Sequence, residues 1–374
     1  MFVLPALGAG GAERVVNIVA NALAARGWRV SVVTFDDPDE ASYYDYAQAV
    51  TLLRLGVPRR RQMRAIAAFV AAGRVRRLRR ALSTAAPGIV ISFLTRTNVL
   101  TLLAAIGTGL PVIVSERNNP RLQHFGPVWS WLRSRLYRRA YGLVTMTQGA
   151  MDCFPPALRP RHWVIPNPAV TAAQAPVAGG ATKGLVAAGR LVPQKGFDLL
   201  LEAFARIAGE HPDWELVIWG EGPERTVLEN AALRLGIAAR VRMPGLSARP
   251  GGWAAQGDLF VMSSRYEGWG NVLLEALGAG MPAIAFDCPW GPREMIDHGV
   301  NGMLVAPGDV AALAGRISAL MHDAALRARL GAAARRSVDK FAADDVVAAW
   351  EAIIVDAVAM RRASLDARPR PTIF

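Results

Sequence analysis

The chain has 374 residues, of which 52% are hydrophobic and 20% are charged, and lysine and arginine outnumber aspartate and glutamate by 43 to 30. This length exceeds what one hydrophobic core usually supports, so two domains are expected. The formal charge of +13 indicates a negatively charged partner: a nucleic acid, an anionic membrane surface or a phosphorylated small molecule.

Several classes of protein are excluded at this stage. No apolar run approaches the roughly 20 residues of a membrane-spanning helix, and the N-terminus lacks the charged region of a signal peptide. Two cysteines, Cys153 and Cys288, are too few for a ligand set, and nothing motivates a disulfide between them. A cytoplasmic location is therefore expected.

Apolar runs alternate with a helical pattern along the first half. Strands are expected at 2–7, 30–35, 89–93 and 112–114, and a helix at 12–25. Strand, helix and strand in this order predict a parallel sheet.

A glycine loop follows the first expected strand and precedes the helix. Gly8, Gly10 and Gly11 can bring backbone N–H groups against an anion. As a dinucleotide fingerprint the loop fails, because Glu13 stands where a glycine is needed, although Asp36 could serve as the acidic ribose contact. A nicotinamide or flavin enzyme is therefore only a weak alternative.

Arginines gather in two segments of the first half, Arg59–Arg80 and Arg133–Arg139. The first predicts a pair of basic amphipathic helices, and the second is interleaved with tryptophan, leucine and tyrosine. Such helices suit attachment to anionic lipid headgroups, and a solvated helix face is the alternative. The arginines of the first segment are Arg59, Arg60, Arg61, Arg64, Arg74, Arg76, Arg77, Arg79 and Arg80.

The second half repeats the plan of the first. Around 167–183 the composition changes to alanine, proline, glycine and threonine, which is typical of a linker. The strands expected beyond it, at 185–188, 216–219, 241–243, 259–262, 283–286 and 303–305, predict a second doubly wound domain. Ligands of open parallel sheets bind beyond the carboxyl ends of the strands, so two such domains are expected to face each other across a cleft.

Two cations lie five residues apart in the loop after the first of these strands. They are Arg190 and Lys195, in the run Gly189-Arg190-Leu191-Val192-Pro193-Gln194-Lys195-Gly196. An arginine fork and a mobile lysine could hold a diphosphate and follow its growing charge as it leaves. An ordinary pair of loop cations is the alternative.

The most informative segment is 264–282, which holds two glutamates, a glycine turn and a short helix. Asn271 is expected to cap that helix at its N-terminus. Unpaired N–H groups at the helix start favour a phosphate, with Glu267 before the site and Glu275 behind it.

Taken in chain order, four motifs resemble those of the retaining glycosyltransferases of family 4. They are Gly10–Glu13, Gly189-Arg190 with Lys195-Gly196, Glu267 with Glu275, and Gly291-Pro292-Arg293-Glu294. They span nearly the whole chain, and the glutamate pair with the Arg/Lys loop is the specific combination. The last turn is most similar to bacterial enzymes that build surface polysaccharides and lipid-linked oligosaccharides; read by itself, it is a stiff structural turn.

The resemblance implies an α/β fold of the GT-B type. Two Rossmann-like domains with doubly wound parallel sheets would face across a cleft, and a C-terminal helix would cross back to the first domain. The expected division is an acceptor-binding domain at 1–166, a linker at 167–183, a nucleotide-sugar-binding domain at 184–340, the returning helix at 341–362 and a tail at 363–374.

The resemblance also implies roles for single residues. Glu267 is expected to bind hydroxyls of the donor sugar, Glu275 the ribose, and Arg190 and Lys195 the diphosphate. Further donor contacts are expected from Gly268, Asn271, Val272, Leu273, Gly220, Glu221, Gly245, Leu246 and Glu294. The loop of Gly10, Gly11 and Glu13 is expected on the acceptor and diphosphate side.

Retention is expected to proceed by front-face attack, in which the leaving phosphate takes the acceptor proton. The two glutamates are then hydroxyl binders, and neither a metal nor a cofactor is expected. Many family members carry a histidine in the loop occupied here by residues 115–119. Glu116 is chosen as its catalytic replacement, with Arg117 next; the alternative is that the two pair at the loop surface.

The expected reaction moves a sugar from a UDP-sugar to a lipid-linked saccharide or polysaccharide precursor at the cytoplasmic membrane face. The protein would bind that membrane peripherally through Arg59–Arg80 and Arg133–Arg139. A GDP-mannose-dependent mannosyltransferase is the main alternative, because no residue distinguishes uracil from guanine. A nucleotide-sugar epimerase is weaker, since the five histidines lie outside the motifs. Nucleic acid is not expected, because the aromatic residues form no base-stacking series.

Overall fold

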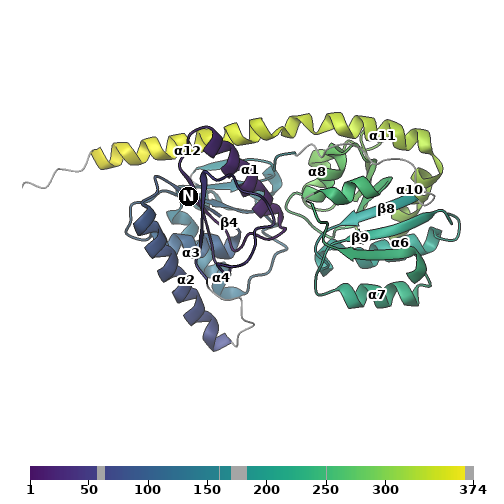
Figure 1. Cartoon of the computed structure of the whole chain (residues 1–374), viewed down its shortest axis with the longest axis horizontal. Helices are drawn as coiled ribbons and strands as arrows, with labels where there is room; N and C mark the ends of the chain where they lie inside the picture. Colours follow the sequence, from purple (N-terminus) through teal and green to yellow (C-terminus); the bar gives the residue numbers. More distant parts are fainter. Residues whose placement is uncertain (57–63, 160, 170–182, 250, 367–374) are drawn as a thin grey trace, which may run out of the picture. The chain divides into compact units, whose positions relative to one another are not determined.

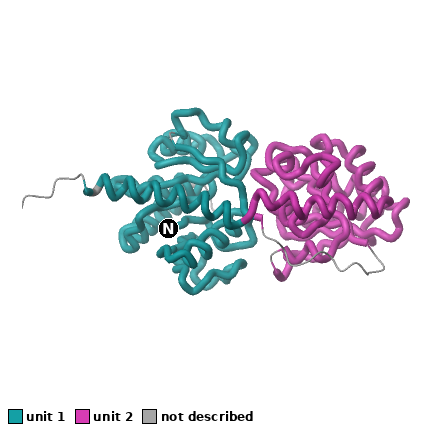
Figure 2. The backbone as a smooth tube through the Cα atoms, turned by 90° about the horizontal axis from the view of Figure 1, so that it is seen from above, with its two compact units in different colours: residues 1–168, 343–374 teal, residues 169–342 magenta. Residues whose placement is uncertain are grey.

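The computed structural model describes residues 1–56, 64–159, 161–169, 183–249 and 251–366 (Figure 1). The chain divides into two compact units, Met1–Pro168 with Ala343–Phe374, and Ala169–Ala342 (Figure 2). Residues 170–182 of the predicted linker, 367–374 of the predicted tail, and Arg59, Arg60 and Arg61 lie outside the described residues.

Within the described residues, the first unit holds a sheet of seven parallel strands in the order β3-β2-β1-β4-β5-β6-β7. The strands are β1 (Phe2–Val3), β2 (Val30–Thr34), β3 (Val50–Arg54), β4 (Val90–Phe93), β5 (Val112–Ser115), β6 (Gly142–Thr145) and β7 (His162–Val164). The predicted parallel sheet is thus confirmed.

Strand β1 is shorter than the predicted 2–7. Pro5 has no N–H to continue the ladder, and the N–H of Leu7 donates instead to the Asp36 carboxylate at 2.9 Å. That buried carboxylate, considered above as a ribose contact, thereby holds the loop after β1. The sequence pattern does not predict β3, β6 or β7, because these strands are short and partly exposed or begin with glycine.

Helices cover both faces of this sheet. One face carries α1 (Gly11–Ala25) and α12 (Ala343–Asp366), which lie side by side in Figure 1. Trp350 of α12 is fully buried, and its ring centroid lies 5.7 Å from that of Phe93 in β4. The C-terminal helix therefore returns to the first unit, as predicted.

The other face carries α2 (Arg64–Ala85), α3 (Thr95–Ala105) and α4 (Pro127–Leu136). The predicted pair of basic helices is wrong for the described residues, since α2 runs unbroken through Gly73. A single interior glycine costs a helix only about 1 kcal/mol. The short elements η1 (Tyr137–Arg139), α5 (Gln148–Met151) and η2 (Pro156–Leu158) complete the unit.

The described part of the second unit contains six parallel strands in the order β10-β9-β8-β11-β12-β13. They are β8 (Lys183–Ala188), β9 (Trp214–Trp219), β10 (Val241–Gly245), β11 (Leu259–Met262), β12 (Ala283–Phe286) and β13 (Met303–Val305). Counted within the unit, this order is 3-2-1-4-5-6, the doubly wound order, whose switch point lies between β8 and β11.

The long helices of this unit are α6 (Phe197–Ile207), α7 (Arg225–Arg234), α10 (Val310–His322) and α11 (Ala324–Ser337). In α6 the buried residues Phe197, Leu200, Leu201, Phe204 and Ile207 recur at helical spacing, and they join the core beneath the sheet. The remaining elements are α8 (Asn271–Gly278), α9 (Pro292–Met295), η3 (Pro193–Lys195), η4 (Ala238–Arg240), η5 (Gly252–Gln256) and η6 (Asp339–Phe341).

Membrane-spanning helices were also sought. Among the described residues, none is both long enough and apolar enough to cross a bilayer.

Candidate active site

Two predicted site residues meet at the switch point of the second unit. Lys195 follows β8 and Glu267 follows β11, and these strands are neighbours in the sheet. Lys195 Nζ donates to Glu267 Oε1 at 2.6 Å, and the Ser264 hydroxyl donates to the same oxygen at 2.6 Å. The lysine side chain is 14% exposed and the glutamate side chain 7%. The ion pair is therefore largely screened from water.

Backbone contacts hold these two loops together. The N–H of Arg265 donates to the carbonyl of Gln194 at 2.8 Å, and the Gln194 amide donates to the carbonyl of Tyr266 at 2.9 Å. Gly196 has a φ of +62°, and a β-carbon on it would lie 2.1 Å from the carbonyl oxygen of Ser263. Only glycine fits there, which explains the Lys-Gly pair of the motif.

Arg190 differs from Lys195 in its surroundings. Its side chain is exposed, and it makes no hydrogen bond or ion pair with any residue that the structure describes. The loop that carries it is nevertheless ordered by backbone bonds, with the N–H of Leu191 donating to the carbonyl of Glu221 at 2.9 Å. Arg190 is therefore a cation on a fixed loop whose guanidinium remains available to an anion.

The second glutamate lies on α8. Glu275 is half-buried, and its Oε2 accepts a hydrogen bond from Trp253 Nε1 at 3.1 Å. Trp253 is buried in η5, so this bond fixes the direction of the carboxylate. A carboxylate has two oxygens that can each accept more than one hydrogen bond, so such a group suits the hydroxyl groups of a ligand.

The predicted cap of α8 is wrong. The N-cap is Gly270, with a left-handed φ of +97°, and Asn271 is the first helical residue. A left-handed backbone favours glycine strongly, which overrides the capping preference of asparagine. The N–H of Leu273 donates to the carbonyl of Gly270 at 2.9 Å, so this predicted phosphate donor is already engaged. Val272, half-buried, lies in the same first turn.

The loops after β9 and β10 adjoin the loop after β8. The N–H of Gly220 donates to the carbonyl of Gly245 at 2.8 Å, and a β-carbon on Gly220 would lie 1.9 Å from the Gly189 carbonyl oxygen. The Glu221 carboxylate takes two hydrogen bonds from Arg225, at 2.6 and 3.0 Å, which lower its pKa. Leu246 is 53% exposed beyond them. The predicted base-pocket residues thus share the carboxyl edge of the sheet.

The loop after β12 closes against the loop after β11. The N–H of Glu267 donates to the carbonyl of Pro289, and the N–H of Trp290 donates back to the carbonyl of Glu267, both at 3.1 Å. Glu294 Oε2 accepts a hydrogen bond from the N–H of Gly291 at 2.9 Å. The Glu294 side chain, predicted to contact the nucleotide sugar, thus binds the backbone at the start of its own helix. Gly268, buried, completes the turn between them.

A buried thiol lies beside the Lys195–Glu267 pair. Burial and the Glu267 carboxylate raise the pKa of Cys288 well above its ordinary value. The thiol therefore stays protonated at neutral pH and is a poor nucleophile.

The glycine loop of the first unit brings a carboxylate to a helix start. Helix α1 begins at Gly11 with Gly10 as its N-cap, and a β-carbon on Gly10 would lie 2.0 Å from Glu13 Oε2. Glu13 thus folds back over the first turn. The three residues predicted for the acceptor and diphosphate loop, Gly10, Gly11 and Glu13, thus lie together at this helix start, and their role stays a prediction.

Glu116, chosen above as the catalytic replacement, lies in the interior of the first unit, which rules out the alternative of a surface pair. It is 2% exposed, and its carboxylate accepts hydrogen bonds from Thr95 Oγ1 at 2.7 Å and from the Tyr137 hydroxyl. Burial raises its pKa, and these hydrogen bonds partly oppose that shift. The Tyr137 hydroxyl oxygen also accepts a hydrogen bond from the Asn98 amide at 3.0 Å. These contacts suit an internal strut, and the catalytic role of Glu116 stays a prediction.

Arg117 does not pair with Glu116. Its guanidinium lies over the rings of Phe93 and Trp350, at 4.9 and 5.3 Å from their centroids, and donates to Asn167 Oδ1 at 2.8 Å. Burial lowers its pKa to about 9. The side chain therefore ties the loop after β5 to α12 within the first unit.

Two residues of the site were not predicted from the sequence. Ser264, which bonds Glu267, stands inside the glutamate motif and could have been noticed as a hydroxyl three positions before the carboxylate. Trp253, which bonds Glu275, lies in a segment without any pattern, and nothing in the sequence indicates it.

Family models match both halves of the chain. The model described as "Glycosyl transferase 4-like domain" matches residues 10–168, and that described as "Glycosyl transferases group 1" matches residues 175–337.

Among curated proteins, the chain is 39% identical over 203 residues to an exopolysaccharide phosphotransferase of Streptomyces coelicolor, covering 54% of this chain and 21% of that protein. It is 38% identical over 160 residues to the lipopolysaccharide core biosynthesis glycosyltransferase LpsE of Rhizobium meliloti, covering 43% of this chain and 44% of the relative. The matches thus span less than half the length of these relatives.

Solved structures resemble the whole chain. Sucrose-phosphate synthase of Thermosynechococcus elongatus has a TM-score of 0.80 at 19% identity, covering 98% of this chain and 99% of that one. HepE of Anabaena, in complex with UDP and glucose, has a TM-score of 0.73 at 19% identity, covering 95% and 98%. At this identity the likeness shows the fold. With one family model over each half and this fold throughout, the chain belongs to the glycosyltransferases of the GT-B type.

Proposed function

We propose that this protein transfers a sugar from a nucleotide-sugar donor to a saccharide acceptor with retention of configuration, the donor being bound by the second unit. The observation that carries this proposal is the ion pair of Lys195 and Glu267 at the switch point, with the Arg190 side chain, on the same loop as Lys195, unpaired among the described residues. A charged cradle at the carboxyl end of a doubly wound sheet suits a ligand with both a diphosphate and hydroxyl groups.

In this mechanism the bond between the anomeric carbon and the diphosphate breaks, and a bond to the acceptor oxygen forms on the same face. The acceptor proton passes to the departing diphosphate oxygen. Arg190 binds the diphosphate, and Lys195 stabilises its charge as it grows, where low exposure makes the ammonium effective. Glu267 positions the sugar hydroxyls while it holds Lys195, and Glu275 takes the ribose.

UDP is the proposed nucleotide. HepE was solved with UDP and glucose, and a second similar structure, TarM of S. aureus, was solved with UDP. The names of the curated relatives refer to exopolysaccharide and to the lipopolysaccharide core, which supports an acceptor that is a lipid-linked saccharide or polysaccharide precursor. A GDP-mannose donor is the alternative, because the sequence motifs of the site do not distinguish uracil from guanine.

A donor panel tests this proposal. The purified full chain is incubated with UDP- and GDP-sugars and a lipid-linked saccharide, and products are identified by mass spectrometry, with the anomeric configuration read by NMR. A UDP-sugar is expected to give a glycosylated acceptor of retained configuration. An inverted product would overturn the mechanism, transfer only from GDP-mannose would overturn the nucleotide assignment, and an epimerised donor without transfer would overturn both.

Attachment to an anionic membrane is proposed for the first unit. The exposed side chains that support it are apolar and basic: Phe69, Arg76 and Arg80 of α2, Val128, Trp131 and Arg135 of α4, and Arg138 and Arg139 of η1. Arg77 and Arg79 donate to backbone carbonyls, and Arg133 lies over the rings of Phe125 and Phe154. These three arginines are therefore not counted among the side chains that contact the membrane.

Vesicle flotation tests this attachment. The wild type is expected to bind vesicles that contain phosphatidylglycerol, and to be released by salt because screening weakens each contact. The double variant Arg76→Glu/Arg80→Glu should lose binding, whereas Arg335→Glu/Arg336→Glu, at two exposed positions of α11 in the second unit, serves as a charge-matched control. Equal binding to neutral and anionic vesicles would contradict the proposal.

A further inference from the structure

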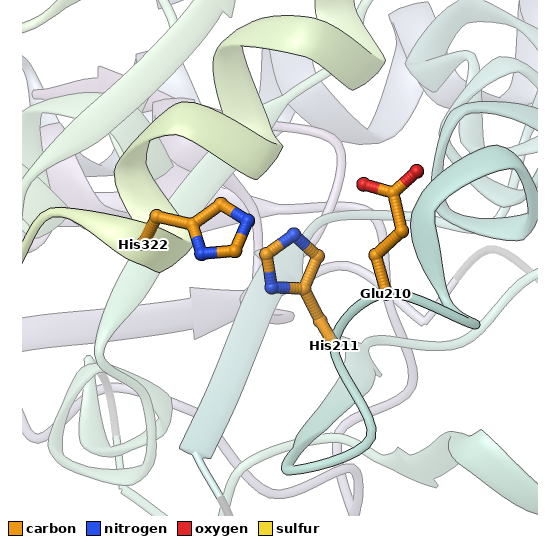
Figure 3. A group of neighbouring side chains, drawn as sticks. All are labelled: Glu210, His211 and His322. Atoms are coloured by element: carbon orange, nitrogen blue, oxygen red, sulfur yellow. The ribbon is translucent and has the colours of Figure 1, made fainter.

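Two histidines and a glutamate gather at the opposite edge of the second unit's sheet. Glu210 and His211 lie in the loop between α6 and β9, and His322 is the last residue of α10 (Figure 3). This loop precedes a strand, so the cluster lies at the amino ends of the strands. The candidate active site lies at their carboxyl ends, and it uses none of these residues.

The three side chains converge on one another. Each offers one ligand atom, and these three atoms lie within 4.8 Å of one another. The two imidazole rings have centroids 4.4 Å apart, and His211 lies between His322 and Glu210 in Figure 3. His211 is buried, whereas the other two side chains are exposed.

Neighbouring residues fix the buried histidine. His211 Nε2 lies 2.9 Å from the Ser318 hydroxyl, one helical turn before His322 on α10. Arg240 donates to the His211 carbonyl, which holds the backbone of the loop. His211 is therefore an anchored imidazole, and its two exposed neighbours can rotate toward it.

No other contact explains this grouping. Neither the Glu210 carboxylate nor the His322 ring makes a hydrogen bond or salt bridge with a residue of the described chain. A neutral imidazole offers the lone pair of one ring nitrogen for a ligand bond. Glu210 and Asp213 add negative charge at this ring, and Arg240 adds positive charge.

We propose that Glu210, His211 and His322 bind a zinc ion. Two imidazole nitrogens and one carboxylate oxygen, with water in the fourth position, form a common tetrahedral zinc set. Magnesium and calcium take oxygen ligands and do not suit two imidazoles. Bonds of about 2.0–2.2 Å place tetrahedral ligand atoms about 3.4 Å apart, so Glu210 and His322 must close in on His211, whose Nε2 exchanges the Ser318 hydroxyl for the metal.

Such an ion would connect the α6–β9 loop to the end of α10. Because it lies at the edge of the sheet away from Lys195 and Glu267, it stabilises the second unit and takes no part in sugar transfer. Zinc that binds the folded state alone raises the midpoint of thermal unfolding, and once the site is filled the stabilisation grows with the logarithm of the zinc concentration.

The test titrates zinc into the tag-free full chain, freed of metal by chelation, and follows binding by calorimetry. The wild type is expected to bind one zinc ion with an affinity at least about tenfold above that of His322→Ala and of Glu210→Gln, because losing a ligand costs at least as much as losing a second-sphere partner. His124→Ala, which changes an exposed histidine of the first unit, should bind as the wild type does.

A second readout is thermal unfolding, in which zinc should raise the midpoint of the wild type and of His124→Ala but not that of His322→Ala. Both substituted cluster residues are exposed, so these variants fold. Wild-type protein that binds no zinc at 1 mM would overturn the proposal, and so would His322→Ala that binds as tightly as the wild type. Equal binding of magnesium would overturn the assignment of the metal.

Discussion

The loops that follow the central strands carry charged residues in both units, and the two sets differ in what surrounds them. In the second unit, Lys195 pairs with Glu267 across two neighbouring loops, and Arg190 stays exposed beside them. In the first unit, Glu116 and Arg117 are buried among hydroxyls and aromatic rings. The same position at the end of a strand therefore carries an ion pair with an exposed arginine on its loop in one unit and a buried side-chain network in the other.

The backbone accounts for this difference. In the second unit, glycines such as Gly196 and Gly220 let neighbouring loops approach each other and bond through their main chains. In the first unit, the loop after β5 is tied down by side chains, through Thr95 and Tyr137 to Glu116 and through Asn167 to Arg117. The predictions below use this contrast.

The largest effect is expected for Lys195→Ala. Loss of a preorganised cation beside the leaving group should lower kcat by about 10²- to 10³-fold, with a smaller change in donor KM. Steady-state kinetics, run below the unfolding midpoints of both proteins, measure it. Lys183→Ala removes a lysine that is 44% exposed and pairs with Asp213, and it should keep wild-type turnover. A kcat within threefold of wild type for Lys195→Ala would refute the leaving-group role.

The first unit should respond in stability rather than in turnover. Glu116→Ala leaves Thr95 and Tyr137 with buried hydroxyls that lack their acceptor, which should cost about 3 kcal/mol of unfolding free energy. Thermal unfolding would then shift by about 6–12 °C for a unit of this size. At a temperature where both proteins are folded, kcat should change less than threefold; a loss of turnover without a loss of stability would support the catalytic role of Glu116.

Glu275→Ala should act on donor binding. Loss of a ribose contact should raise the donor KM about tenfold while kcat changes little, which corresponds to about 1.4 kcal/mol. Glu229→Ala, which removes an exposed carboxylate paired with Arg225, is the matched control. An unchanged donor KM for Glu275→Ala would contradict a contact between Glu275 and the ribose.

The smallest effect concerns pH. Burial raises the pKa of Glu116, so the folded state holds this proton to a higher pH than the unfolded chain does. Its contribution to stability is therefore present below the ordinary glutamate pKa and is lost as pH rises through the raised value, by at most about 1.4 kcal/mol per pH unit. The midpoint of thermal unfolding of Glu116→Gln should rise relative to that of the wild type as the pH is raised from 4 to 8. A constant difference between the two midpoints would contradict a raised pKa of Glu116.

Much of the second unit's fold can be predicted from the sequence. The predicted strands at 259–262, 283–286 and 303–305 coincide with β11, β12 and β13, because a strand covered on both faces is a continuous apolar run between turn residues. Edge strand β7 of the first unit has no such run, so the sequence pattern does not predict it. The predicted helix cap at Asn271 is wrong because capping preference is local, whereas the left-handed backbone of Gly270 results from the packing of the turn.

The candidate site divides in the same way. The pairing of Lys195 with Glu267 follows from two motifs at neighbouring strand ends, and strand order is predictable for a doubly wound sheet. The burial of Glu116 is not predictable, because its partner Tyr137 lies 21 residues away in a segment without a motif. The cluster of His211 and His322 likewise depends on how α10 packs against α6, which no local pattern reveals.

Calorimetric binding of UDP and GDP to the full chain tests the contrast between the two units most directly. The account predicts that at least one nucleotide binds the wild type, and that Arg190→Ala weakens it about tenfold or more, since a charged hydrogen bond contributes about 1.5–3 kcal/mol. Glu116→Gln and the exposed α6 variant Arg206→Ala should bind as the wild type does. Wild-type affinity in Arg190→Ala, or weakened binding in Glu116→Gln alone, would contradict it.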